Sequence, residues 1–194
     1  MSAIAIVERP VIEGANDSRL LRAWRQGDPT AGRELFTRHY DTIYRFFDSK
    51  IKRDILELVE GTFRDCLGDG VVGANARAEL LAFATVRLYD HFRYEHMLEV
   101  MASTEGAFDP ALHSLQALGG HPSTMIGTEP ELRLLREAVP RIPLGEQILL
   151  ELCFEDEQPS GPAWARVLGV EARTLPSRLD DAWKHLEHEL SLLE

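Results

Sequence analysis

The 194-residue sequence has few cysteines and no long apolar segment. Both features limit the classes of protein to which it can belong. Cys66 and Cys153 stand far apart, each inside an apolar helical pattern, which favours buried thiols over a disulfide, a metal cluster or a nucleophile. No run approaches the roughly 20 apolar residues of a membrane span. The opening "MSAIAIVERPVIEGAND" lacks the basic start and the cleavage site of a signal peptide. We therefore expect a cytoplasmic protein that does not contact a membrane.

The residue groupings that mark enzymes are also missing from the sequence. No nucleophile, base and orienting group recur together, and no glycine-rich phosphate loop occurs. His185 and His188 are three residues apart on one predicted helix, but no third ligand accompanies them, so an exposed pair is favoured over a metal site. We expect no catalytic residue, no metal and no cofactor.

Positive charge is scarce, particularly near the C-terminal end. The formal net charge is −11, and residues 129–194 contain 7 basic and 14 acidic side chains, against 14 and 16 in residues 1–99. Because Lys and Arg supply most non-specific affinity for nucleic acid, strong DNA binding by the isolated chain is not expected. The densest basic run, "KIKR" at 50–53, is either an ordinary helix end or a patch for a partner.

Helical periodicity is what the sequence has in abundance. Apolar residues recur every three or four positions, and strand patterns are almost absent, which predicts an all-α protein. We expect two small helical domains: an N-terminal tail at 1–16, a four-helix domain at 17–99, a linker at 100–128 and a second domain at 129–194. The linker is rich in Gly, Pro, Ser and Thr, with one short helix expected at "PALHSLQAL".

Local signals place several helix ends in the first domain. Asp17 or Ser18 is expected to cap the first helix, and Asp28 the second, with Pro29 at a position where its missing N–H costs nothing. A third helix is expected near 55–66 and a fourth near 76–98. The second helix should bury one apolar stripe, formed by Phe36, Tyr40, Ile43, Phe47 and Ile51.

Near the C-terminus, the spacing of small, flexible and aliphatic residues predicts a helix-turn-helix. Ala165 suits the first helix, Gly169 the turn and Leu175 the second helix, although any two helices meeting at a glycine share this pattern. Pro176 cannot donate a backbone hydrogen bond, so the second helix should begin no earlier than about residue 174.

Both halves resemble bacterial sigma factors. "LLRAWRQGDPTAGRELFTRHYDTIYRFF", "ELVEGTF" at 57–63 and "RLYDHFR" at 87–93 are similar to one conserved sigma domain. The C-terminal part is similar to the promoter-reading domain, through Ile142, Pro143, Ile148, Leu149, Leu152, Ala165, Leu168, Gly169, Val170, Thr174, Ser177, Arg178, Leu179 and Ala182. Two matches in the right order indicate a small sigma factor of the extracytoplasmic-function type.

The resemblance implies a non-enzymatic specificity subunit of core RNA polymerase. The third helix would dock on the β′ clamp helices through Glu57, Leu58, Glu60, Thr62 and Phe63. The fourth helix would open the minus-ten element of promoter DNA with Arg77, Arg87, His91, Arg93 and Tyr94. The second domain would sit on the β flap and read the minus-thirty-five element with Arg173, Thr174, Ser177, Arg178 and Lys184. An anti-sigma protein would be a further partner.

Departures from the family cluster at the DNA-facing positions. The loop "GDGVVGANARAEL" has no aromatic residue and only Arg77 as a cation, and Glu79 stands where the family has tryptophan. In the reading helix, the family's basic residues are replaced by Pro176, Asp180 and Asp181. The alternative function is therefore a degenerate sigma-like interaction module, a decoy for an anti-sigma protein or an assembly subunit, with little DNA binding. An independent repressor is disfavoured because it would leave the N-terminal match without a role.

Overall fold

The computed structural model describes residues 13–52, 54–68, 76–100, 108–118, 132–155 and 161–193. Within these ranges the chain forms eight α-helices and short 3₁₀ turns, with no strand. The expected all-α fold is confirmed.

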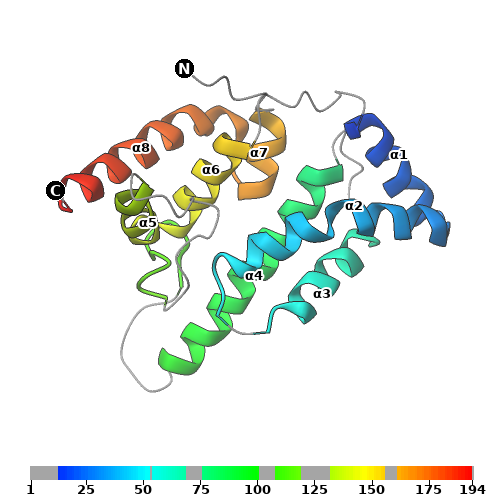
Figure 1. Cartoon of the computed structure of the whole chain (residues 1–194), viewed down its shortest axis with the longest axis horizontal. Helices are drawn as coiled ribbons and strands as arrows, with labels where there is room; N and C mark the ends of the chain where they lie inside the picture. Colours follow the sequence, from blue (N-terminus) through cyan, green and yellow to red (C-terminus); the bar gives the residue numbers. More distant parts are fainter. Residues whose placement is uncertain are drawn as a thin grey trace.

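The helices form two groups that meet along one long helix. The first group is α1 (Glu13–Arg25), α2 (Pro29–Asp48), α3 (Leu56–Cys66) and α4 (Ala76–Val100). The second is α5 (Arg133–Ala138), α6 (Leu144–Glu155), α7 (Gly161–Leu168) and α8 (Leu175–Ser191). Figure 1 shows α4 running through the middle of the molecule, with α1 and α3 on one side and the second group on the other. The two groups also touch directly, because α7 packs against α4.

One of the two predicted helix caps is confirmed. Asp28 Oδ1 accepts hydrogen bonds from the N–H groups of Thr30 and Ala31, at 2.8 and 3.3 Å, and Pro29 is the first residue of α2. The prediction for α1 is wrong, because α1 begins at Glu13 and residues 17 and 18 are buried inside it. The carboxylate of Asp17 is not needed as a cap, since it binds side chains of α2.

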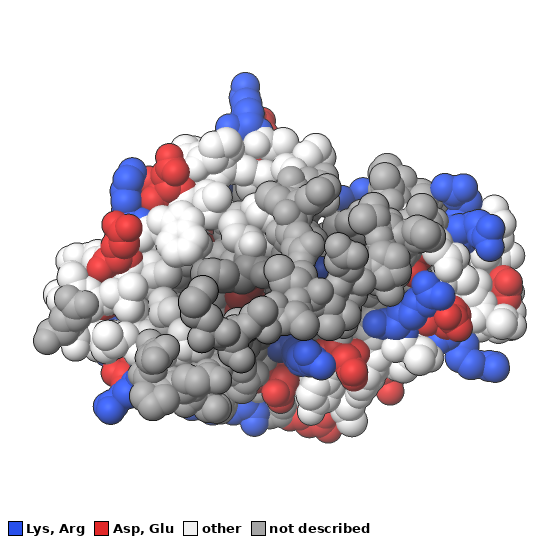
Figure 2. Space-filling view, turned by 45° about the horizontal axis from the view of Figure 1, so that its top comes forward, with Lys and Arg blue, Asp and Glu red and all other residues white. Residues whose placement is uncertain are grey.

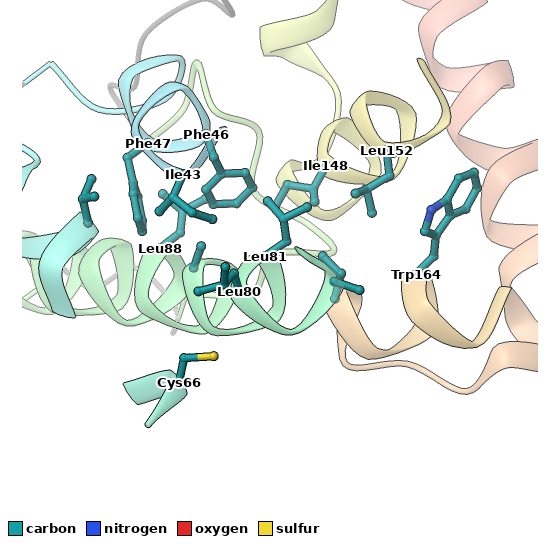
Figure 3. Packing of buried hydrophobic residues seen from close by; sticks show 14 of the residues in the cluster. Ile43, Phe46, Phe47, Cys66, Leu80, Leu81, Leu88, Ile148, Leu152 and Trp164 are labelled. Atoms are coloured by element: carbon teal, nitrogen blue, oxygen red, sulfur yellow. The ribbon is translucent and has the colours of Figure 1, made fainter. Parts of the chain in front are cut away.

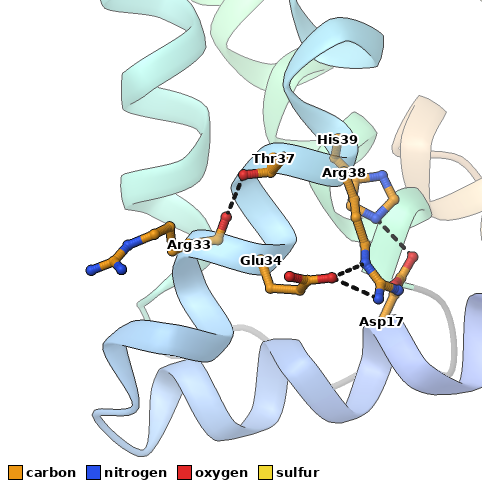
Figure 4. A network of polar contacts seen from close by, with 6 residues as sticks. All are labelled: Asp17, Arg33, Glu34, Thr37, Arg38 and His39. Atoms are coloured by element: carbon orange, nitrogen blue, oxygen red, sulfur yellow. Dashed lines mark hydrogen bonds and ion pairs between the residues drawn. The ribbon is translucent and has the colours of Figure 1, made fainter.

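A small polar network joins α1 to α2 (Figure 4). Asp17 Oδ1 lies 2.7 Å from Nη1 of Arg38, and Asp17 Oδ2 lies 2.9 Å from Nε2 of His39. Glu34 Oε1 in turn accepts from Arg38 Nε at 2.9 Å. Burial lowers the pKa of His39 below its usual value, against the opposing effect of the Asp17 charge, and the charge of Arg77 lowers it further.

The burial of His39 predicts that the stability of the protein depends on pH. Its imidazole binds fewer protons in the folded chain than in the unfolded chain, so the free energy of unfolding should fall as the pH drops below about 6.5. His39→Gln should flatten this decrease, as measured by urea unfolding at neutral and acidic pH. His188→Gln removes an exposed imidazole from α8 and should leave the decrease unchanged. Equal slopes for both variants would contradict the assignment.

The predicted apolar stripe of α2 is buried only in part. Ile43 and Phe47 are buried, but Tyr40 is half-buried and Phe36 is 36% exposed. Ile51 is buried too, although it lies beyond the end of α2 at Asp48. Phe36 lies at the edge of the bundle, where its ring centroid is 4.7 Å from that of Phe63 in α3. Phe46 is also buried, and Figure 3 shows its ring directed towards Ile148 of the second group.

A single hydrophobic cluster runs through both groups of helices. It joins Ile43 and Leu81 of the first group to Ile148, Leu152 and Trp164 of the second (Figure 3). A smaller cluster lies within the second group and contains Ala138, Val139, Ile142, Leu150, Ala182 and Leu186. The two halves of the chain therefore pack together as one body.

The described part of the expected linker, residues 108–118, packs between the two groups: the Phe108 ring lies against Tyr89 and Phe92 of α4, with ring centroids 6.1 and 6.3 Å away. Phe108 and Leu115 are buried, and the backbone N–H of Gln116 donates to the carbonyl of Pro140 at 2.8 Å. The short helix expected here is wrong, because this segment forms turns. Its backbone groups bond elsewhere: the His113 carbonyl accepts from the N–H of Leu144, at 2.9 Å, in the first turn of α6.

Candidate macromolecule-binding surfaces

The helix α3 divides the five predicted polymerase-binding residues between its two faces. Glu57 and Glu60 are exposed, together with Leu56, which is 47% exposed, and Leu58 is half-buried. The two exposed carboxylates, Glu57 and Glu60, are here called the acidic face of α3; the apolar Leu56 lies at its start, and the exposed cation Arg64 lies one turn after Glu60. Asp54 Oδ1 accepts the backbone N–H of Leu56 at 3.0 Å.

The other two predicted contacts, Thr62 and Phe63, lie inside the bundle. The Thr62 hydroxyl donates to the carbonyl of Leu58 at 2.8 Å, and Phe63 is only 3% exposed. Neither side chain is exposed in this conformation, and their role in polymerase binding stays a prediction. The Phe63 ring packs on Phe36 of α2 and so fixes α3 to the bundle, whereas the Thr62 hydroxyl bonds within its own helix.

The predicted DNA-binding side chains of α4 are mostly engaged with carboxylates. Arg87 Nε donates to Asp65 Oδ2 at 2.6 Å, and its guanidinium covers Gly61, where an added Cβ would come within 2.4 Å of it. Arg93 forms an ion pair with Asp90. His91 Nε2 lies 3.6 Å from Glu95 Oε2.

Two further predicted residues of α4 differ in exposure. Tyr94 is 60% exposed, so its ring is available to a partner. Arg77 is half-buried at the start of α4, close enough to His39 to affect its pKa. All five predicted residues therefore lie on α4. Arg77 is about three turns before the group formed by Arg87, His91, Arg93 and Tyr94.

A short turn at Gly169 separates α7 from α8. Gly169 follows α7 with a φ of +65°, which glycine adopts at no steric cost. The N–H of Val170 donates to the carbonyl of Ala165 at 2.9 Å and closes the turn. A 3₁₀ turn (Ala172–Thr174) then leads into α8, which begins at Leu175 with Pro176 in its first turn, as expected.

The predicted reading face of α8 and its preceding turn is nearly neutral. Arg173 pairs with Glu171, and Lys184 Nζ lies 3.6 Å from Asp181 Oδ1. The hydroxyls of Thr174 and Ser177 donate to the backbone carbonyls three residues before them, at 2.8 and 2.9 Å. Figure 2 shows the same mixture on a wider scale, since blue and red side chains alternate on the visible face instead of forming one basic patch.

Arg178 lies at a cleft between the two halves. This cleft has a volume of about 450 Å³, and its lining includes Tyr89 of α4, Gly145 and Glu146 of α6, and Asp181 of α8. Burial raises the pKa of Tyr89 to about 12, and the charge of Arg178 acts in the opposite direction. Arg178 of α8 thus faces α4 in this conformation.

Two contacts between the halves are not indicated by the sequence patterns. Lys50, from the basic run at 50–53, is fully buried and its Nζ lies 2.7 Å from Glu151 Oε2 of α6. Glu79 of α4 is 1% exposed and lies 3.0 Å from Arg25 of α1 and 4.0 Å from Arg166 of α7. Lys50 is therefore paired inside the protein, and it is not part of a surface patch in this conformation.

Comparison with known proteins supports the architecture. The sequence matches no protein-family model and no curated protein. The chain folds like CnrH, an extracytoplasmic-function sigma factor. The match to the structure of CnrH in complex with the cytosolic domain of CnrY covers 91% of this chain and 98% of that chain. The TM-score is 0.57 and the sequence identity is 19%, so the likeness is one of fold.

Within the described ranges, no helix has the length and apolar character that crossing a membrane requires. The same ranges contain no group of three or more His, Cys, Asp or Glu side chains placed to hold a metal ion. Cys66 is buried and Cys153 is half-buried, and both are free thiols. Burial raises the pKa of Cys66 to about 11, which keeps it protonated and poorly nucleophilic at neutral pH.

Proposed function

We propose that this chain is a sigma-factor-like transcription initiation protein, which binds core RNA polymerase and directs promoter recognition. The observation that carries the proposal is the match in fold to CnrH over nearly the whole of both chains. The exposed acidic face of α3 would dock on the β′ clamp helices, and the corner at Gly169 would place α8 on promoter DNA with its domain on the β flap. In this role the chain is a specificity subunit working in the cytoplasm, built from the two domains expected at 17–99 and 129–194.

The neutral DNA-facing surfaces are compatible with this role if polymerase holds the chain on the promoter. Exposed ion pairs such as Arg93–Asp90 and Lys184–Asp181 typically contribute only about 0–1 kcal/mol each, so phosphates can replace the carboxylates at little cost. Tethering to polymerase raises the effective concentration of the reading helix at the promoter. The isolated chain should accordingly bind promoter DNA weakly.

A charge reversal on α3 tests polymerase binding. Glu57→Arg should weaken co-elution with purified core polymerase by roughly tenfold or more, because it replaces one of the two exposed carboxylates of α3 with a cation. Asp41→Arg changes an exposed side chain of α2 and alters the net charge equally, so it is the matched control and should co-elute normally. Phe63→Ala is less informative because it removes a buried ring. The proposal is wrong if the unaltered chain fails to co-elute at both low and physiological salt.

A second function is favoured by the acidic residues of α8. Asp180 and Asp181 are exposed where the family has basic residues, which suits a sigma-like interaction module with little DNA binding, such as an anti-sigma decoy. Transcription of a genomic promoter library by core polymerase plus this protein separates the two functions. Reproducible start sites support promoter recognition, and their absence despite polymerase binding supports the interaction module.

A further inference from the structure

The cleft beside Arg178 has the size and the mixed lining of a small-molecule site. Its volume of about 450 Å³ lies within the range of about 300–1,000 Å³ that is usual for ligand sites in proteins. Four parts of the chain meet around it: α4, the segment 108–118, α6, and the turn that leads from α7 into α8. Leu149, Leu168 and Val170 give the lining an apolar part, and Leu149 is only 1% exposed. A small molecule in the cleft therefore meets apolar side chains as well as charged ones.

Two opposite charges on this lining are unpaired. Asp109 and Arg178 both border the cleft. Burial is the main cause of the raised pKa of Tyr89, but Arg178 and Asp109 act on this pKa in opposite directions, so both charges lie near the same hydroxyl. Within the described residues, neither Asp109 nor Arg178 forms an ion pair. Asp109 Oδ1 accepts the backbone N–H of Ala111 at 2.9 Å, which leaves the other carboxylate oxygen for a ligand.

The other two carboxylates of the lining already have partners. Glu146 Oε2 lies 2.7 Å from Nδ1 of His185, and Asp181 Oδ1 lies 3.6 Å from Nζ of Lys184. Asp109 is consequently the carboxylate of the lining that is left to bind a cation.

The Tyr89 hydroxyl is a further polar group of the cleft. No hydrogen bond joins it to another described residue, and it lies 3.7 Å from the position that a Cβ on Gly145 would take. With a pKa of about 12 it stays protonated at neutral pH, so it can donate to an anion. The first turn of α6 does not compete, because the N–H of Gly145 donates to the carbonyl of Pro110 at 2.9 Å. Arg178 and Tyr89 are thus the side-chain donors that the lining offers to a ligand.

We propose that the cleft binds a free α-amino acid with an aliphatic side chain. The ammonium group pairs with the Asp109 carboxylate, and the carboxylate of the amino acid accepts from the Arg178 guanidinium and the Tyr89 hydroxyl. The aliphatic side chain lies on the apolar part of the lining. A molecule with one charge fits less well, because an amine meets the like charge of Arg178 and a fatty acid meets that of Asp109. This binding belongs to the free chain, so it does not depend on the proposed role with polymerase.

Nuclear magnetic resonance on the isotope-labelled full chain tests this proposal with three probes of similar shape. L-Leucine carries both charges, isoamylamine lacks the carboxylate, and isocaproate lacks the ammonium group. L-Leucine should shift the backbone amide signals of Gly145 and Val170 with a Kd below about 1 mM. Each single-charge probe should bind roughly tenfold more weakly, because it loses a charge-assisted hydrogen bond.

Three substitutions in the lining should each weaken the binding of L-leucine. Tyr89→Phe and Arg178→Gln remove the two donors, and Asp109→Asn removes the negative charge but keeps an oxygen for the turn. Each should raise the Kd about tenfold. Tyr44→Phe on α2 and Arg136→Gln on α5 make the same chemical changes away from the cleft and should leave the Kd unchanged. Circular dichroism checks that every variant is folded.

Three results would overturn the proposal. The first is that about 10 mM L-leucine leaves the Gly145 and Val170 signals in place. The second is that isoamylamine or isocaproate binds as tightly as L-leucine. The third is that none of the three substitutions in the lining raises the Kd.

Discussion

Glu151→Ala should lower the free energy of unfolding by about 3–5 kcal/mol, among the largest losses expected from one substitution in this chain. The change leaves the Lys50 ammonium with 0% exposure and without its carboxylate, 2.7 Å from where Oε2 was. The Ser49 hydroxyl and the Phe46 carbonyl still accept from Nζ, but neither carries a compensating charge. Urea unfolding followed by circular dichroism would measure the loss.

The double variant Lys50→Met/Glu151→Leu distinguishes a missing partner from a generally intolerant site. Removing both charges together with well-packed apolar replacements is often neutral or stabilising by about 1–4 kcal/mol. We therefore expect the double variant to be at least as stable as the unaltered chain, although each single deletion is not. A double variant as unstable as Glu151→Ala would show that the ion pair itself holds the two halves together.

The local features of the fold were predictable because each depends on residues close in sequence. Asp28 and Pro29 begin α2 as expected, since a carboxylate acceptor and a residue without an N–H suit a helix start. Gly169 with φ +65° and Pro176 in the first turn of α8 follow from the same kind of steric argument. The cap expected at residues 17 and 18 was wrong because α1 begins earlier, at Glu13, and the Asp17 carboxylate binds side chains of α2 instead.

The contacts between the halves were not predictable from local patterns. Lys50 and Glu151 are separated by 101 positions, and a lysine in a basic run gives no sign that it will be buried. Glu79 gives a weak signal, since it interrupts the apolar pattern of α4 where the sigma family has tryptophan, but its arginine partners lie on α1 and α7. Long-range pairing of this kind depends on the packing of complete helices.

The helices that carry the candidate surfaces were predictable from the sequence. Which residues of those helices are exposed was harder to predict. The expected site on α3 was assigned by resemblance to a motif, and a motif does not separate its surface residues from its core residues. Thr62 and Phe63 proved to be core, while Glu57 and Glu60 form the surface. Helical periodicity carries the missing information, because residues 59, 62, 63 and 66 share the apolar face of α3.

Phe47→Ala should lower the free energy of unfolding by about 3–5 kcal/mol, because it deletes a ring from the cluster that both halves share. Phe47 is 0% exposed, and its ring centroid lies 5.4 Å from that of Phe46 in an edge-to-face arrangement. Figure 3 shows it above Leu88 of α4. The neighbouring helices cannot close the space without moving, so both the lost apolar contacts and the remaining cavity contribute.

Phe36→Ala is the matched control, since it removes the same atoms from the same helix at a ring that is 36% exposed. Water already reaches part of this side chain, so the expected loss is smaller, about 1–2 kcal/mol. For a chain of this size each kcal/mol lowers the melting temperature by roughly 2–4 °C, which makes the two variants separable by thermal unfolding. Equal losses for both rings would mean that Phe47 does not lie in the core, and the packing of α2 against α4 would then need revision.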